Sequence, residues 1–327
     1  MSAGHHHDHH PHRGPLLASL SALYLIWGST YLAAAYCLRD LPPFVITGVR
    51  FTLAGAGLYA FARLRGAPAP NRAQWMRLTV IGALLIVGGN AGVVWAQKTV
   101  ASGVVALMIG MMPIWMSLID WLFAGGAKPT ARATLGMACG LCGVGLLLNP
   151  FGSSGGREVS WEGFAAVLLA TLAWATGSVI TRHSKHLPKN GLLSVGAQMF
   201  AGGLCVALMA LVSGDYTTTR WSAVSSLTVF SMLWLMLAGS IITFVAYNWL
   251  LQNTTPAVAG SYAYVNPLIA VLLGWRLNDE PLSLRIVGAG ALIIVGVALI
   301  ILRKRVKRSS SSGANAPLGA PSANART

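Results

Sequence analysis

Residues 227–251 read LTVFSMLWLMLAGSIITFVAYNWLL, a run of 25 residues without a charged side chain. An α-helix rises about 1.5 Å per residue, so roughly 20 apolar residues cross the hydrocarbon core of a bilayer. The run is long enough to predict a membrane-spanning helix, and it decides the class of the protein before any other feature is considered.

Similar apolar runs recur on both sides of this stretch. Membrane β-barrels would instead show alternating segments of about ten residues. The expected fold class is therefore all-α and integral to the membrane, with ten transmembrane helices. They are predicted at residues 16–38, 42–62, 78–97, 102–123, 133–148, 161–181, 192–212, 227–251, 257–275 and 286–302.

The composition agrees with a membrane protein. Hydrophobic residues make up 55% of the chain and charged residues only 9%, against roughly a quarter charged in an ordinary soluble domain. A net charge of +15 would suggest nucleic acid as the partner of a soluble protein. Here the basic residues lie in the tails and at the ends of the apolar runs, which is the pattern that orients membrane proteins. We therefore expect a lipid bilayer as the partner, and no nucleic acid.

The distribution of Lys and Arg also predicts the orientation. With ten helices the two termini share a side, and 16 of the 23 basic residues fall on that side. Six fall on the opposite side, and Arg50 lies within a predicted helix. Because positive charge concentrates in cytoplasmic segments, both termini are predicted to be cytoplasmic.

The two halves of the chain share a pattern of residues. Trp95, Pro113 and Trp121 recur 154 positions later as Trp249, Pro267 and Trp275. Trp27 of the first predicted helix corresponds in the same way to Trp174 of the sixth, 147 positions later. Each repeat would hold five helices, an odd number, so the second must be inverted relative to the first. Inverted repeats are typical of transporters that open to either side of the membrane by rocking.

These boundaries give a predicted domain organisation. Residues 1–15 form a disordered, His-rich cytoplasmic tail, 16–149 the first five-helix repeat, 150–160 a linker, 161–302 the second repeat, and 303–327 a basic, disordered cytoplasmic tail. Cys139 and Cys142 form a CxxC pair inside the fifth predicted helix, without a second pair. We interpret them as packing residues rather than as a metal or redox site.

Short motifs occur along the predicted helices in a fixed order. They are IWGSTY at residues 26–31, PP at 42–43, VRF at 49–51, GN at 89–90, SYAYVNP at 261–267 and DEPL at 279–282. In this order and spacing the chain resembles the drug/metabolite transporter superfamily, specifically its ten-helix EamA-type permeases. The resemblance covers residues 16–302 and implies a bacterial inner-membrane protein that exports amino acids, metabolites or drugs. One departure is KPT at residues 128–130, where the second repeat has EPL, which weakens any role for a paired acidic motif.

Polar side chains inside a bilayer are costly and should face the bundle interior or a wet cavity. Many polar and aromatic residues of the predicted helices share helical faces, as Trp27 and Tyr31 do at i and i+4. They suggest a cavity of aromatic rings and neutral hydrogen-bonding groups, suited to amphipathic or zwitterionic molecules. The alternative is that these rings only pack between helices or anchor at the interface. The candidate substrate-binding residues are Trp27, Tyr31, Asn90, Met108, Met111, Trp174, Ser178, Thr243, Tyr247, Tyr262, Tyr264 and Asn266.

Two charged residues lie within the predicted helices at positions that bear on function. Arg50 could bind a substrate carboxylate with two parallel hydrogen bonds, or it could serve a structural role. Asp120 lies near the inner end of the fourth helix, where we expect it to reach interfacial water. A proton relay at the midplane is therefore lacking, and we expect at most weak proton coupling. His183 and His186 are expected in the cytoplasmic connection that follows the sixth helix.

The sequence predicts a transporter rather than an enzyme. It carries no HExxH motif, so we expect no catalytic residues, cofactor or metal. The favoured function is export of a small amphipathic molecule by alternating access, for which a monomer suffices. An organophosphate or nucleotide-sugar exchanger is the alternative, although it would need several basic residues in the cavity. A channel or a non-transporting scaffold is the second alternative, which would not need two rocking halves.

Overall fold

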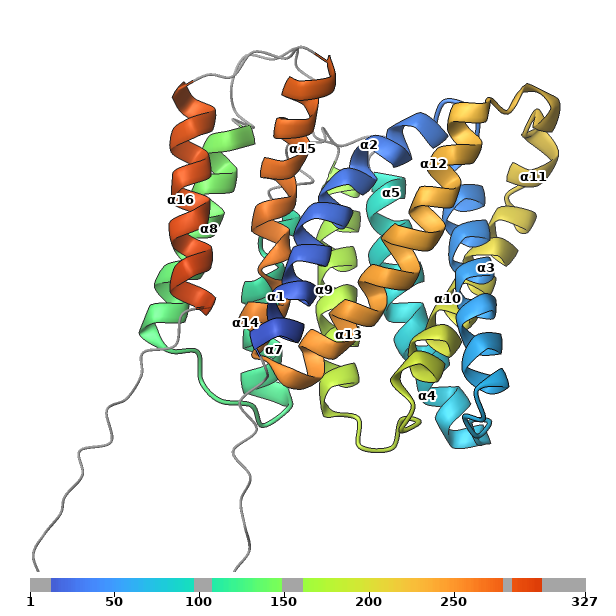
Figure 1. Ribbon diagram of the computed structural model, residues 1–327, viewed down its shortest axis with the longest axis horizontal. Helices are drawn as coiled ribbons and strands as arrows, with labels where there is room; N and C mark the ends of the chain where they lie inside the picture. The colour runs from blue at the N-terminus through green and yellow to red at the C-terminus, as the bar shows by residue number, and fades with distance from the viewer. Residues whose placement is uncertain (1–12, 97–107, 149–160, 279–283, 302–327) are drawn as a thin grey trace, which may run out of the picture.

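The computed structural model describes residues 13–96, 108–148, 161–278 and 284–301 (Figure 1). Within these ranges the chain forms helices and no strand, which confirms the all-α class. The elements of the first half are α1 (Arg13–Ala22), η1 (Leu23–Trp27), α2 (Gly28–Cys37), α3 (Pro43–Leu64), α4 (Arg72–Gly82), η2 (Ala83–Ala91), α5 (Gly92–Ala96), α7 (Met112–Phe123) and α8 (Ala131–Leu148). The elements of the second half are α9 (Trp161–His183), α10 (Gly191–Val212), α11 (Asp215–Thr218), η3 (Trp221–Ala223), α12 (Ser226–Met236), η4 (Leu237–Ile242), α13 (Thr243–Asn253), α14 (Pro256–Gly260), α15 (Tyr262–Asn278) and α16 (Leu284–Ile301).

Six helical runs are long and apolar enough to cross a membrane. They are Arg13–Ala34, Pro43–Leu64, Arg72–Ala96, Trp161–His183, Gly191–Val212 and Ser226–Asn253. Three shorter apolar helices stand at the predicted fourth, fifth and tenth spans, namely Met112–Phe123, Ala131–Leu146 and Val287–Ile301. Part of the fourth predicted span, residues 102–107, lies outside the described ranges. The structure thus confirms a helical, membrane-spanning chain, while the count of ten spans stays a prediction.

Local capping sets helix ends that hydropathy alone places differently. The Asn71 side chain accepts a hydrogen bond from the Gln74 backbone, and the Gln74 side chain accepts one from the Asn71 backbone. This capping box starts α4 at Arg72, six residues before the predicted start at residue 78. At the other end of a span, α9 continues to His183. The placement of His183 in a connecting loop was therefore wrong.

Glycine allows α3 and α10 to pack at very close range. A methyl group on Gly55 would lie 2.2 Å from the Phe200 backbone nitrogen, and one on Gly203 would lie 2.4 Å from the Thr52 nitrogen. Small residues at such positions are the usual way for membrane helices to approach one another, since lipid gives no hydrophobic drive for association. In the same way, α8 and α16 approach through Gly136 and Gly296, at one side of the bundle in Figure 1.

The remaining contacts build the centre of the bundle. Helix α2 packs against α12 and α15, and α9 packs against η2, α5 and α7. In Figure 1 helices α1, α9, α13 and α15 run between the α8–α16 pair and the α3–α10 pair. The largest buried cluster of the described residues draws on all four of these helices, and it holds the candidate site residues Trp27, Trp174, Tyr247, Tyr262 and Tyr264 in the interior.

Candidate functional site

Three wide, π-helical turns interrupt the long helices. They are η1, η2 and η4, and each sits inside a run that could cross the membrane. A π turn disturbs the regular backbone ladder and leaves carbonyl groups available to side chains, which is one reason such turns occur frequently at functional sites. In η4 the carbonyl oxygen of Gly239 accepts hydrogen bonds from Trp27 Nε1 at 3.1 Å, from Arg50 Nη2 at 2.6 Å and from Thr243 Oγ1 at 2.9 Å.

Arg50 is buried, and it is bound by the same turn. Besides its bond to Gly239, its Nε donates to Ser240 Oγ at 2.6 Å. Among the described residues no carboxylate pairs with it. A buried charge without a counter-ion needs aligned dipoles to offset its desolvation, and the carbonyl and hydroxyl of η4 supply them. Two of the donors that would hold a substrate carboxylate are thus engaged by the protein, and this geometry favours the structural interpretation of Arg50.

Trp27 lies at the centre of an aromatic cluster. Its ring centroid is 4.6 Å from that of Tyr262, 5.4 Å from Tyr247, 5.8 Å from Phe244 and 5.9 Å from Trp174. Most of these pairs meet edge to face, the arrangement that suits the charge distribution of aromatic rings. The rings come from η1, α9, α13 and α15, so the cluster joins the first half of the chain to the second. Trp27 and Trp174, which correspond to each other in the two repeats, are in direct contact.

A chain of hydrogen bonds runs through this cluster. Trp174 Nε1 donates to the Tyr247 hydroxyl at 3.0 Å, because an indole nitrogen can only donate. The Ser178 hydroxyl donates to the Trp174 carbonyl at 2.7 Å. The Tyr247 hydroxyl and Ser178 Oγ lie 2.6 Å apart and share a hydrogen bond. Trp174, Tyr247 and Ser178 thus form a line of polar groups surrounded by aromatic rings, here called the polar seam. Such a site can recognise a ligand that carries both apolar surface and hydrogen-bonding groups.

The structure brings together about half of the predicted site residues. Four belong to the aromatic cluster, namely Trp27, Trp174, Tyr247 and Tyr262. Ser178 bonds to Tyr247, and Thr243 bonds to the Gly239 carbonyl that also accepts from Trp27. Asn90 is half-buried in η2, next to Gly89, which touches the Trp174 ring. Phe244 and the Gly239 carbonyl were missed. Phe244 is adjacent in sequence to Thr243, and its aromatic side chain was the available signal.

Other predicted residues lie elsewhere. Met108 packs with Ala96 and Val167 in a separate small cluster. Tyr264 packs against Gly140 of α8. The Tyr264 hydroxyl and Asn266 Oδ1 are buried without a hydrogen-bond partner within the described ranges. Remaining members of the predicted set are Met111, which is half-buried just before α7, and Tyr31, whose side chain lies outside the described part.

Carboxylates link the two halves at opposite ends of the bundle. Asp40, which follows α2, accepts hydrogen bonds from the Ser225 backbone at 2.9 Å, the Ser225 hydroxyl at 2.8 Å and the Thr228 hydroxyl at 2.6 Å. These bonds, with that from Thr228 the strongest, hold the pKa of Asp40 below its ordinary value.

At the other end, Asp120 Oδ1 of α7 lies 2.5 Å from His183 Nε2 and 3.6 Å from Arg182 Nε. Asp120 is 4% exposed. The expectation that its carboxylate reaches interfacial water was therefore wrong, because α9 extends far enough to cover it with two basic side chains.

The fold and this core define a polytopic membrane protein whose two halves meet at an aromatic and polar centre. The chain belongs to the EamA-like transporter family, whose sequence profile matches residues 12–149 and 161–302. It is therefore a membrane transporter, and the resemblance seen in its motifs is confirmed.

Related proteins match over nearly the full length. The chain is 37% identical over 292 residues to the inner membrane transporter YedA of Escherichia coli (strain K12), covering 89% of this chain and 92% of that one. It is 27% identical over 289 residues to Protein PecM of Dickeya dadantii, covering 86% and 93%. One crystal structure aligns with a TM-score of 0.72 at 20% identity, over 88% of this chain and 97% of that one. This last likeness supports the fold alone.

Proposed function

We propose that the protein exports small amphipathic metabolites, amino acids or drugs across a bacterial inner membrane, and that the Trp27 cluster binds the substrate. The observation that carries this proposal is the cluster itself, with aromatic rings from both halves arranged around the polar seam of Trp174, Tyr247 and Ser178. Inner-membrane location is supported by the name of the relative YedA, and both termini are proposed to be cytoplasmic from the charge distribution.

The proposed mechanism is alternating access by two inverted five-helix repeats. The pattern of contacts supports it, because exchanging the halves maps several of the main helix contacts onto other helix contacts. The α2–α12 contact corresponds to α9–η2, α2–α15 corresponds to α9–α7, and α3–α12 corresponds to α10–α4. The α3–α10 and α8–α16 contacts each correspond to themselves. Halves related in this way can rock about the shared α3–α10 and α8–α16 contacts, opening the centre to one side at a time.

An exchanger of organophosphates or nucleotide sugars is less well supported. Such a substrate would need several basic side chains at the centre to neutralise its phosphates. Around the Trp27 cluster Arg50 is the one basic side chain among the described residues, and two of its donors are held by Gly239 and Ser240. A channel or a scaffold would not account for the exchange relation between the halves.

Transport in proteoliposomes tests the site, with a panel of radiolabelled amino acids and fluorescent amphipathic dyes as probes. Tyr247→Phe removes the hydroxyl that joins Trp174 to Ser178 and should lower the initial rate by about tenfold, equivalent to roughly 1.4 kcal/mol. Tyr59→Phe is the matched control, since Tyr59 lies outside the cluster and contacts Trp75 at a tilted angle, and it should transport normally. Equal rates for both variants, with equal amounts of folded protein, would show that the cluster is not the substrate site.

A further inference from the structure

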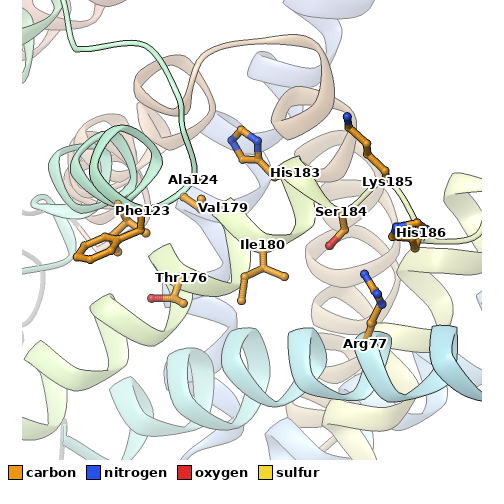
Figure 2. A pocket seen from close by; sticks show the side chains of 11 residues that line it. Arg77, Phe123, Ala124, Thr176, Val179, Ile180, His183, Ser184, Lys185 and His186 are labelled. Atoms are coloured by element: carbon orange, nitrogen blue, oxygen red, sulfur yellow. The ribbon is translucent and has the colours of Figure 1, made fainter.

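A second site is built where α4, α7 and α9 converge, at the same end of the bundle as Asp120. A cavity of about 480 Å³ opens there, within the range of roughly 300–1,000 Å³ typical of small-molecule sites. Figure 2 shows the side chains that line it, with Arg77 rising from α4 and His183, Ser184, Lys185 and His186 at the end of α9 and in the residues after it.

The charge around this cavity is positive and uncompensated. Arg77 and Lys185 have no acidic partner among the residues that the structure describes. The nearest carboxylate, Asp120, is already bonded to His183 and Arg182. Basic residues at a membrane boundary usually point separately into water, whereas here two cations and two histidines border a single hollow.

The walls of the same cavity are apolar. Ile119 and Phe123 of α7 face Val179 and Ile180 of α9 across it. The Phe123 side chain is 83% exposed, and it is the last residue of α7. A ligand there would meet cations on one side and hydrocarbon on the other, so the cavity suits an anionic headgroup attached to an apolar tail.

We propose that this cavity binds the phosphate of an anionic phospholipid. Arg77 can hold two phosphate oxygens at once through its planar guanidinium. The Lys185 ammonium adds a second positive charge, and the Ser184 hydroxyl offers a neutral donor. Ile119, Phe123 and Ile180 contact the start of the acyl chains. Basic pockets between spanning helices are known to recognise anionic headgroups in this way, and the site does not depend on what the transporter carries or in which direction.

Native mass spectrometry of the purified full-length protein tests the proposal, by comparing retention of added phosphatidylglycerol and phosphatidylcholine. The double variant Arg77→Gln and Lys185→Gln should lose phosphatidylglycerol binding by about tenfold or more, the effect of removing charge-assisted contacts. The matched control is Arg72→Gln with Lys189→Gln. It removes two charges from the same end, but at residues that do not line the cavity, and it should bind phosphatidylglycerol as the wild type does.

Further arms separate the sources of phosphate. Inorganic phosphate and glycerol 3-phosphate are titrated alone, and binding that depends on Arg77 and Lys185 without a preference for phosphatidylglycerol would assign the site to a free phosphate. Equal losses in the control pair, or no binding of any phosphate compound, would overturn the proposal. Equal thermal midpoints in phosphatidylcholine nanodiscs verify that the variants fold, and Arg77→Lys, which keeps the charge, should retain part of the binding.

Discussion

Asp40 and Asp120 both join the first half of the molecule to the second, Asp40 after the end of α2 and Asp120 near the end of α7, and they do so by different chemistry. Asp40 is held by neutral donors, the amide and hydroxyl of Ser225 and the hydroxyl of Thr228. Asp120 is held by two basic side chains, Arg182 and His183. The difference follows from burial, because water still solvates an accessible carboxylate, whereas a buried one needs a counter-charge and further hydrogen bonds.

The comparison has a consequence for the transport cycle. Under the proposed alternating access each end opens in turn, and we expect each of these links to break when its end opens. At the Asp40 end, breaking the link exchanges neutral hydrogen bonds for water. At the Asp120 end it separates a buried ion pair, and Arg182 also donates to the carbonyls of Leu251 and Thr254 at the end of α13. We therefore expect the Asp40 end to open more readily than the Asp120 end.

The largest loss of stability is expected from Asp120→Asn. The substitution leaves Arg182 and His183 facing a neutral amide in a buried site. The expected loss is about 2–3 kcal/mol, below the full range for a buried pair because the two basic side chains are partly exposed. Thermal unfolding of the detergent-solubilised protein measures it. A double-mutant cycle with Arg182→Gln should show coupling between the two positions, and strictly additive losses would contradict the ion-pair interpretation.

An intermediate effect is expected from Ser225→Ala. The variant removes the N-cap of α12 together with one hydrogen bond to Asp40, and the loss of such a cap costs about 1 kcal/mol. Ser226→Ala changes the neighbouring exposed hydroxyl and serves as the control. If both serine variants unfold at the wild-type temperature, the Asp40 end is not held as described.

A smaller effect is expected from Asp40→Asn, because asparagine keeps an acceptor oxygen and loses only the charge. The effect should also depend on pH. Since the pKa of Asp40 is lowered in the folded protein, its charge contributes stability above the ordinary carboxyl range, near 3.9, and that contribution is lost as the pH falls through the folded pKa. The stability difference between wild type and variant should be constant near neutral pH and shrink in acid. A difference that grows in acid would contradict this assignment.

The sequence led to the central site where residues repeat between the halves, as Trp27 and Trp174 do, and where a single helical face continues without interruption. It did not reveal the π turns themselves, so the bonds from Arg50 to Ser240 and to the Gly239 carbonyl of η4 could not be predicted. No sequence pattern signals where a π turn will form, because it is fixed by packing between helices.

The ends of the bundle show a second limit. Hydropathy ended the sixth span at residue 181, and the two residues beyond it, Arg182 and His183, are the partners of Asp120. Their helical position depends on tertiary contact with α7. The spans were predicted from the local apolar composition, which does not depend on tertiary contacts. Polar contacts between helices do depend on them, and they are therefore harder to predict from the sequence.

The smallest effect, here on the initial rate of transport, is expected from an imposed pH gradient. Among the eight acidic residues of the chain, Asp120 is the one placed inside a predicted span away from its first turn. The burial of Asp120 makes a coupling role more plausible than its sequence position alone suggested. Asp120 is also linked to the Trp27 cluster through α7, because Met116, one turn earlier on this helix, contacts the Tyr247 hydroxyl at 3.7 Å. The carboxylate is nevertheless paired with Arg182 and His183. Among the residues that the structure describes, no carboxylate contacts the Trp27 cluster to receive a proton in exchange for substrate. We therefore expect transport in proteoliposomes to follow the substrate gradient, with initial rates that change little when a pH gradient is imposed. Uphill accumulation that requires the pH gradient in the wild type, and that is abolished in Asp120→Asn while downhill exchange persists, would instead make the Asp120 link the coupling element and not only the tighter of the two ends.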